Sequence, residues 1–404
     1  MAKTIAIVGA LDSKGEEFKF LKDEIERRSH RTFVIDTSVI GDPVFKADVP
    51  RERVAQAAGT TIGTLQGRND RGEAMAAMSK GIAEIIEIVY NNGTIDGVIS
   101  MGGSAGTAVA TSAMRSLPVG FPKVMVSTVA AGDTAAYVGV KDIVMIPSVV
   151  DVAGINRISR QIYANAVGVI VGMVETELEP VEEKPLIAAT MFGNTTNAVD
   201  QARTIMESQG YEVLVFHCTG TGGQTMEGLI ADGLVEGVLD ITTTEWADEL
   251  VGGVLTAGPT RLEAAAAAGI PQVIVPGCMD MVNFWAPDTV PERFKDRKLH
   301  RWNPNITLMR TDVEENAQLG KILADKANAS SGPVSFFLPL KGLSILDSPD
   351  NEYWWPEADR ALFDGIMNNV RDGISVTEMN CNINDPEFAE AVAGKLLECL
   401  GNKK

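Results

Sequence analysis

The sequence predicts an α/β protein of two lobes, each a Rossmann-like parallel sheet covered by helices. Short apolar runs rich in β-branched residues alternate with helix-length segments along most of the chain. The runs follow a similar order in both halves. The length of 404 residues also exceeds what one ordinary core holds and suits two domains of roughly 200 residues each.

The first half opens with a strand, a loop and a helix. The apolar run Thr4–Gly9 (TIAIVG) predicts a buried strand, and apolar residues at helical spacing predict a helix over Gly15–Arg28. Further strands are predicted at Thr32–Asp36, in 95–103 (IDGVISMGG) and in 122–128 (PKVMVST). Because helix-length segments separate these strands, we expect a parallel sheet with both faces covered.

An acidic, proline-containing stretch at Glu175–Pro185 (ETELEPVEEKP) interrupts the apolar rhythm. We place the domain boundary there, with domains at 1–178 and 179–404. After it the pattern restarts, and the strands in 235–245 (VEGVLDITTTE) and 271–277 (PQVIVPG) correspond to the later two strands of the first half. A duplication would explain this order, and a cleft is expected between the lobes.

Composition excludes several classes of protein. A net charge of −19 gives no general attraction to nucleic acid or anionic lipid. The four cysteines show no CxxC spacing, and no window of about 18 apolar residues predicts a membrane span. Three histidines without paired spacing disfavour a histidine-rich metal centre, so magnesium is the expected metal. We expect a cytoplasmic protein with reduced thiols.

The strongest local motif is the glycine-rich segment 101–107 (MGGSAGT), which follows a predicted strand and precedes a helix. Glycines allow a ligand to approach the backbone, and a helix N-terminus supplies amides and partial positive charge. Ser104 and Thr107 add hydroxyls beside Gly102, Gly103 and Gly106. The motif predicts a phosphate cradle but is neither a P-loop nor a dinucleotide fingerprint. A tight turn without a ligand is the alternative.

Three further loops are expected at the same sheet edge. In 9–15 (GALDSKG), Lys14 could pair with phosphate and Asp12 could hold a metal-bound water, or the loop only caps a helix. Asp36 ends a strand, at a position where an acidic side chain commonly accepts a hydrogen bond from a ribose hydroxyl. The segment 127–134 adds Thr128 and Asp133.

Two arginines precede a later predicted helix. Arg68 and Arg71 lie in 67–72 (GRNDRG), and guanidinium groups match phosphate geometry. A solvated helix start is the alternative reading.

In the second half, the loop 217–223 (HCTGTGG) combines histidine, cysteine and glycines. A catalytic role for His217 or Cys218 would need an acidic partner, for which Glu245, Asp248 and Asp280 are candidates. Adjacent strand residues point to opposite faces, however, so His217 and Cys218 cannot readily act on each other. A structural thiol and a hydrogen-bonded imidazole are the alternative.

Several segments together resemble the ATP-binding domain family named after the tomato mosaic virus resistance protein: IAIVGALDSKGEE, IDTS, DGVISMGGSAGTA, ST…GDT and FGNTTNAVDQAR. Most members have no assigned activity. The resemblance implies a two-lobed α/β fold, ATP with magnesium in the N-terminal lobe, and a homodimer. In the plant protein a TIM-barrel-type domain follows, which implies that such a domain is either missing here or supplied by a separate TIM-barrel partner. The implied nucleotide contacts are Gly9, Asp12, Asp36, Gly102, Gly103, Ser104, Gly106, Thr107, Thr128 and Asp133.

We therefore predict an ATP-binding protein with a regulatory role or slow turnover, because no Walker lysine or kinase signature is present. One alternative is a small-molecule metabolic enzyme that uses the cleft between the lobes, with the His217 and Glu245 loops as its machinery. Another is a scaffold for a TIM-barrel protein. The sequence assigns no metal ligands.

Overall fold

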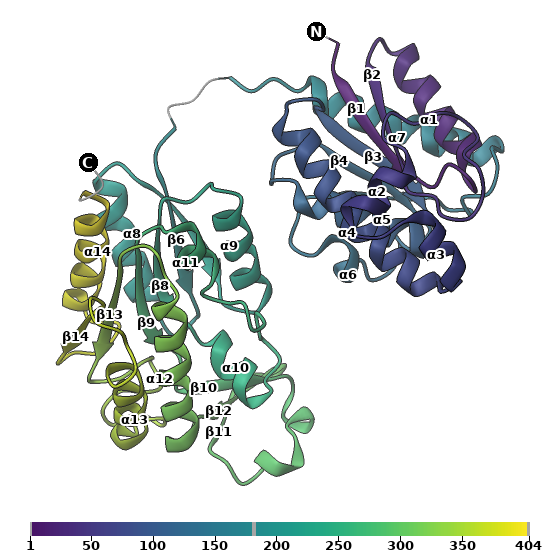
Figure 1. Cartoon of the computed structure of the whole chain (residues 1–404). Coiled ribbons are helices and arrows are strands. Elements are labelled where there is room, and N and C mark those ends of the chain that lie inside the picture. Colours follow the sequence, from purple (N-terminus) through teal and green to yellow (C-terminus); the bar gives the residue numbers. More distant parts are fainter. Residues whose placement is uncertain (1, 180–182, 402–404) are drawn as a thin grey trace. The chain divides into compact units, whose positions relative to one another are not determined.

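Two units, residues 1–180 (unit 1) and 181–404 (unit 2), make up the chain in a computed structural model (Figure 1). The structure describes residues 2–179 and 183–401. Residues 180–182, in the middle of the predicted linker, lie outside this range. Each unit is built on its own parallel sheet, so the predicted fold class of two Rossmann-like α/β lobes is confirmed.

The sheet of unit 1 has five parallel strands in the order β2-β1-β3-β4-β5. The strands are β1 (Thr4–Gly9), β2 (Arg31–Asp36), β3 (Gly97–Gly102), β4 (Lys123–Ser127) and β5 (Val144–Pro147). The chain first adds β2 on one side of β1 and then β3 on the other. The direction of winding therefore reverses between β1 and β3.

Helices cover both faces of this sheet because successive strand residues point in opposite directions. Ile5 and Ile7 face α1 (Gly15–Arg27) and α7 (Arg157–Glu175). Ala6 and Val8 face the other layer. That layer contains α2 (Arg51–Ala57), α3 (Ile62–Arg68), α4 (Arg71–Asn91) and α5 (Ser104–Ser116), and the short α6 (Ala135–Val138) follows β4.

Unit 2 has a six-stranded sheet in the order β14-β13-β9-β8-β6-β7, again all parallel. Its strands are β6 (Leu186–Met191), β7 (Glu212–His217), β8 (Gly237–Thr242), β9 (Gln272–Gly277), β13 (Val334–Pro339) and β14 (Ser375–Met379). The first four occupy the same relative positions as the first four of unit 1. The strands β8 and β9 thus take the places of β3 and β4, as the sequence correspondence predicts.

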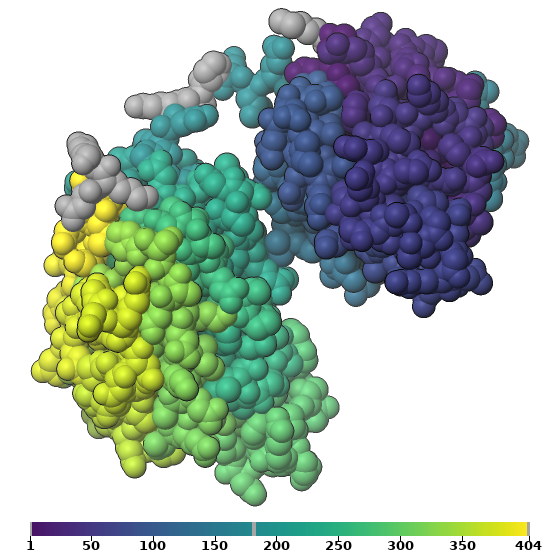
Figure 2. All heavy atoms as spheres, in the orientation of Figure 1, coloured from purple at the N-terminus to yellow at the C-terminus, as the bar shows by residue number. Residues whose placement is uncertain are grey.

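Two helical layers cover the sheet of unit 2. One contains α8 (Thr196–Ser208) and α14 (Pro386–Gly401). The other contains α9 (Thr221–Ala231), α10 (Glu245–Val251), α11 (Ala264–Ala268), α12 (Val313–Asn328) and α13 (Pro356–Met367). In the space-filling view the yellow C-terminal segments form part of the surface of this unit (Figure 2).

An antiparallel sheet is inserted after β9. It has the order β10-β12-β11, with β10 (Met281–Phe284), β11 (Leu299–Asn303) and β12 (Ile306–Arg310), and two 3-10 turns, η1 (Pro287–Thr289) and η2 (Glu292–Phe294), precede β11. All four cysteines are buried and free. Within residues 2–179 and 183–401, no helix is both long and apolar enough to cross a membrane.

Candidate functional site

Two adjoining cavities open at the carboxyl ends of β1 and β3, where the winding of unit 1 reverses. In open α/β sheets this is the position at which ligands bind. The glycine-loop cavity has a volume of about 320 Å³ and is lined by the loops after both strands. The larger cavity, about 660 Å³, lies beside it and shares Ala10, Ser13, Thr37, Arg71, Met75 and Val109 with it. Together the two offer space for a ligand of nucleotide size.

The glycine-loop cavity meets the N-termini of two helices. Neither α5, preceded by Gly103, nor α1, preceded by Lys14, has a side-chain cap at its N-terminus. The first amides of a helix have no intrahelical acceptor. An anion in this cavity would therefore meet unsatisfied amides and the positive ends of two helix dipoles.

The glycines of this loop differ in their surroundings. A side chain at Gly9 would overlap the ring of Phe18, and a Cβ at Gly102 would lie 3.1 Å from Gly106 Cα. These two glycines are required by packing. A Cβ at Gly103 would meet only Thr128 Oγ1, at 3.8 Å. Gly103 thus faces space that the protein itself does not fill.

Two cations line the cavities without a partner. Lys14 lines the glycine-loop cavity, and Arg71 lines both cavities. Neither side chain makes a hydrogen bond or an ion pair within the described part of the chain. Asp151 is the one acidic residue in the lining of the glycine-loop cavity. In the glycine-loop cavity two cations thus stand against one carboxylate, and this balance favours an anionic ligand there.

The larger cavity has an apolar wall. Leu65, Val39, Met75 and Met78 line it, and Met78 is almost fully buried. The carboxylate of Asp12 also lies in the lining and accepts hydrogen bonds from the amides of Ile40 (3.2 Å) and Gly41 (3.0 Å). This cavity suits a flat apolar group, while its neighbour suits an anion.

The structure brings together six of the predicted nucleotide contacts. Those that line a cavity are Gly9, Asp12, Gly102, Gly103, Ser104 and Gly106. The remaining four, Asp36, Thr107, Thr128 and Asp133, are absent from both linings.

Hydrogen bonds explain where these four residues lie instead. Asp36 is buried, and its carboxylate accepts from the Leu11 amide (3.2 Å) and from the amide and hydroxyl of Ser38 (both 2.9 Å). It orders the loops instead of facing a ribose. Thr107 is buried against Ser127, with 2.6 Å between the hydroxyl oxygens.

Thr128 and Asp133 are both exposed. The amide of Thr128 donates to Gly102 O (3.2 Å), and Asp133 accepts from the amide of Ala135 (2.9 Å). Both residues therefore support the backbone of their loop.

The sequence did not predict the apolar wall or Asp151. It also did not distinguish Arg71, which lines both cavities, from Arg68, which lines neither. The helix α4 carries Arg71, Met75 and Met78, which share a face because they lie four and three residues apart. This spacing marks only a buried helical face. Asp151 follows β5, and nothing in its local sequence links it to the loop after β3.

The glycine-rich loop of unit 2 is occupied by a side chain of the protein. Glu245 Oε1 accepts from the amides of Gly220 (2.8 Å) and Gly223 (3.1 Å), while Oε2 accepts from Arg261 Nε (2.8 Å). Burial raises the pKa of Glu245, and the charge of Arg261 opposes that rise. Glu245 therefore takes the place that an anionic ligand would occupy at this helix N-terminus.

The four catalytic candidates of unit 2 do not form one constellation. His217 is exposed, with its ring 5.4 Å from that of Phe192. Cys218 is buried, its thiol donates to Thr242 O (3.1 Å), and burial raises the thiol pKa well above its usual value. No hydrogen bond joins any two of the candidates in the portion of the chain described.

Asp280, the fourth candidate, is fully buried and accepts from the hydroxyl of Ser344 (2.8 Å). Burial and the nearby Asp347 raise its pKa. With Glu245 and Cys218 committed to structural contacts, unit 2 presents no assembled nucleophile and base among these residues.

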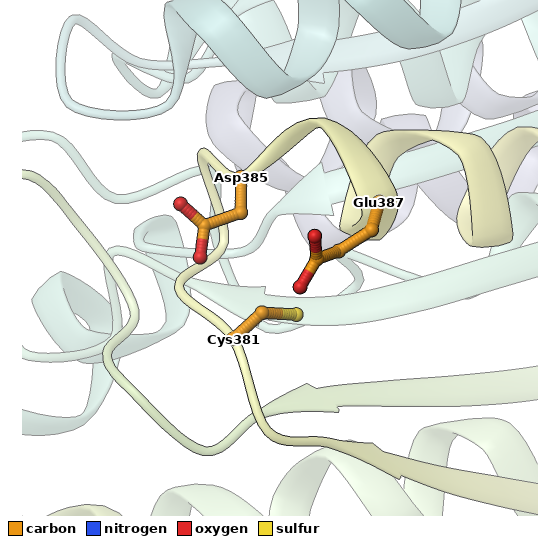
Figure 3. A group of neighbouring side chains, drawn as sticks. All are labelled: Cys381, Asp385 and Glu387. Atoms are coloured by element: carbon orange, nitrogen blue, oxygen red, sulfur yellow. The ribbon is translucent and has the colours of Figure 1, made fainter.

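One group of potential metal ligands is found in residues 2–179 and 183–401: Cys381, Asp385 and Glu387, whose ligand atoms lie within 4.8 Å of one another (Figure 3). Both carboxylates lie at the start of α14, where the helix dipole favours acidic side chains. Asp385 also accepts from the amide of Asn382 (2.8 Å). Burial raises the pKa of Cys381 to about 11, so its thiol is protonated at neutral pH. The start of α14 therefore explains why these three side chains lie together, without a metal ion.

Asp248 provides a test of pH-dependent stability in unit 2. The residue is fully buried, its carboxylate accepts from the amide (2.7 Å) and Nδ2 (2.6 Å) of Asn283, and burial raises its pKa from 3.8 to about 7. The folded state therefore keeps a proton that the unfolded chain releases above pH 4. As pH rises from about 4 to about 7, the free energy of unfolding should lose a contribution on the order of 4 kcal/mol.

The variant Asp248→Asn removes this titration. Asn283 Oδ1 has no partner, so rotation of the Asn283 amide can satisfy the new side chain. Urea unfolding of the variant and of the unchanged protein should be measured at several pH values. The free energy of unfolding should decline more steeply with rising pH in the unchanged protein. Parallel pH profiles would contradict the assignment.

Comparison with known proteins gives a family. The family model described as "Uncharacterised protein family (UPF0261) N-terminal domain" matches residues 3–179, and the corresponding C-terminal domain model matches residues 184–400. The chain belongs to the UPF0261 family. A UPF0261 protein of Clostridium tetani is 51% identical over 402 residues, which cover 99% of this chain and 100% of that protein.

The predicted resemblance to the tomato resistance protein is confirmed as a sequence relationship. "ToMV resistance protein Tm-1(GCR237)" of Solanum lycopersicum is 39% identical over 419 residues, covering 97% of this chain and 55% of the tomato protein. The descriptions of the UPF0261 models mention no ligand. The family relationship therefore assigns no ligand to this chain.

Similarity to solved structures is weak. A putative UDP-N-acetylglucosamine 2-epimerase from Listeria monocytogenes aligns with a TM-score of 0.25 and 11% identity, over 68% of this chain and 79% of that chain. Similarity of this size supports no inference about ligand or activity.

Proposed function

We propose that unit 1 of this UPF0261 protein is an ATP-binding unit with a regulatory role or slow turnover. The observation that carries the proposal is the pair of adjoining cavities at the point of reversed winding, one with helix amides and two cations and the other with an apolar wall. ATP has the matching division into a polyphosphate and a flat base. The sequence resemblance favours ATP over other nucleotides.

In this proposal the phosphates lie against the loop 102–106. The amides at the start of α5 and the side chains of Lys14 and Arg71 hold the phosphate oxygens, and the adenosine lies along the apolar wall. Magnesium, when bound with the nucleotide, would neutralise phosphate charge. Asp151 is the carboxylate in the same cavity that could share such an ion.

The direct test is calorimetric titration of nucleotide-stripped protein with ATP and with ADP, each with and without magnesium. A phosphate-release assay on the same sample follows. Saturable binding without release supports the proposed role. Steady release would make the protein an enzyme, and absence of binding would remove ATP as the ligand.

Arg71 should be a principal determinant of nucleotide affinity. Replacing it by alanine is expected to weaken ATP binding by roughly 10- to 150-fold, because a guanidinium–phosphate contact is worth roughly 1.5–3 kcal/mol. The fold should be unaffected, since Arg71 is exposed and has no partner in residues 2–179. Arg68→Ala is the matched control because Arg68 pairs with Glu73 and is absent from both linings. Equal affinities for the two variants would refute the role of Arg71.

A further inference from the structure

A third cavity is lined by residues of α1 and α7. These two helices pack on the same face of the unit 1 sheet (Figure 1). Its volume is about 340 Å³. We call it the arginine groove, and its lining residues are Phe20, Glu24, Arg27, Arg157, Arg160, Gln161 and Ala164. It shares no residue with the two cavities described above.

The lining follows helical spacing on both sides. The residues from α1 are four and three positions apart, and those from α7 are three, one and three positions apart. Residues at these spacings share one face of a helix. Two facing stripes therefore form the walls, and three exposed arginines, Arg27, Arg157 and Arg160, are among the residues that line them.

Positive charge in the groove is only partly neutralised. Glu24 is the single carboxylate in the lining, and it pairs with Arg27. The side chains of Arg157 and Arg160 make no hydrogen bond or ion pair in the described range 2–179. The whole chain has 54 acidic and 35 basic residues, so an excess of arginine in one groove departs from the composition of the molecule.

The position of these arginines on α7 is electrostatically unfavourable. Arg157 is the first residue of this 19-residue helix and Arg160 is the fourth. The positive end of the helix dipole disfavours cations in the first turn, and the two guanidiniums also repel each other. An anion in the groove would relieve both costs.

The helix amides are not the binding groups here. The Asn156 side chain caps α7 and accepts from the amides of Ile158 (2.9 Å) and Ser159 (3.0 Å). Binding would therefore depend on the guanidinium side chains. Arginine binds phosphate through two parallel hydrogen bonds, which a carboxylate-lined or lysine-lined groove cannot reproduce.

We propose that the arginine groove binds a small molecule that carries a phosphate group. Its volume suits a small ligand, and Phe20 and Ala164 supply an apolar wall for the part of the ligand that is not phosphate. The net charge of −19 opposes a nucleic acid as the ligand. The site is independent of the proposed ATP site.

The test is calorimetric titration with inorganic pyrophosphate at low salt, followed by titration with glycerol 3-phosphate and inorganic phosphate. The double variant Arg157→Gln/Arg160→Gln should bind pyrophosphate in the groove at least about tenfold more weakly. The double lysine variant keeps the charge but loses the paired geometry, and an intermediate affinity is expected. Gly103→Val should retain this binding, which separates the groove from the proposed ATP site.

Arg53→Gln is the control, since Arg53 is exposed on α2 and absent from all three linings. The double glutamine variant should keep or raise the melting temperature, because it removes unfavourable charge from the start of α7.

Tighter binding of glycerol 3-phosphate than of inorganic phosphate supports an organic phosphate ester as the ligand. With the loop 102–106 blocked by Gly103→Val, equal pyrophosphate affinity with and without the two glutamine substitutions would overturn the proposal. Equal affinity for inorganic phosphate and glycerol 3-phosphate would overturn it as well.

Discussion

Replacing Gly103 by valine is expected to weaken ATP binding by at least about tenfold while unit 1 stays folded. The protein has room for the new side chain, because the nearest atom to a Cβ at this position is 3.8 Å away. The backbone angles, φ −77° and ψ −169°, are also ones that valine adopts readily. The added methyl groups would occupy the space that we assign to phosphate.

Calorimetric titration with ATP measures this effect, and thermal unfolding checks the fold. Gly172→Val is the matched control, since Gly172 is exposed on α7 and a Cβ there would meet no atom within 4 Å. A folded Gly103 variant with unchanged ATP affinity would remove this loop from the proposed site. Gly102 is a poor choice for the same test, because a Cβ there would press on the backbone of Gly106.

Arg261→Ala should cause the largest loss of stability in unit 2. The guanidinium is 1% exposed and contacts three carboxylates: both oxygens of Asp240 at 2.6 Å, Glu245 at 2.8 Å and Glu227 at 3.2 Å. Removing it leaves these carboxylates without their cation, although hydrogen bonds to Asp240, Glu245 and Glu227 remain. Breaking such a network typically costs about 3–5 kcal/mol.

Urea unfolding of the Arg261→Ala variant and of the unchanged protein measures this cost. The control is Arg203→Ala, which removes an exposed ion pair with Glu207 and should cost less than about 1 kcal/mol. The loss in free energy of unfolding for Arg261→Lys should lie between the losses for the two alanine variants, since one ammonium cannot replace three guanidinium nitrogens. If the two alanine variants unfold at the same urea concentration, Arg261 does not stabilise unit 2 in the way the contacts indicate.

Glu245 shows most clearly where reasoning from sequence stops. The loops MGGSAGT and HCTGTGG look alike, because each follows a strand and combines glycines with hydroxyls. In unit 2, Glu245 lies 22 residues beyond Gly223 and occupies the amides of that loop. In unit 1, a cavity lies at the corresponding loop. Local sequence cannot distinguish the two loops, because the group that fills one of them comes from a distant segment.

The predicted contacts of unit 1 show the same limit. The loops follow strands as predicted, because short apolar runs that end in glycines and hydroxyl residues are a local signal. Asp36 ends β2 and Thr107 lies in the first turn of α5, and hydrogen bonds to a neighbouring loop and strand direct their side chains away from the cavities. Which side of a loop a residue faces depends on those partners.

By itself, the sequence determined the α/β class, the parallel sheets and the similar strand order of the two halves. These follow from periodicity and from the alternation of strands with helices, both of which are local properties of the chain. Only the tertiary structure decided which glycine loop adjoins a cavity, that Arg71 lines both cavities and that arginines of α1 and α7 share a groove. Those features join residues tens to more than a hundred positions apart, and only strand order and helix packing bring such residues together.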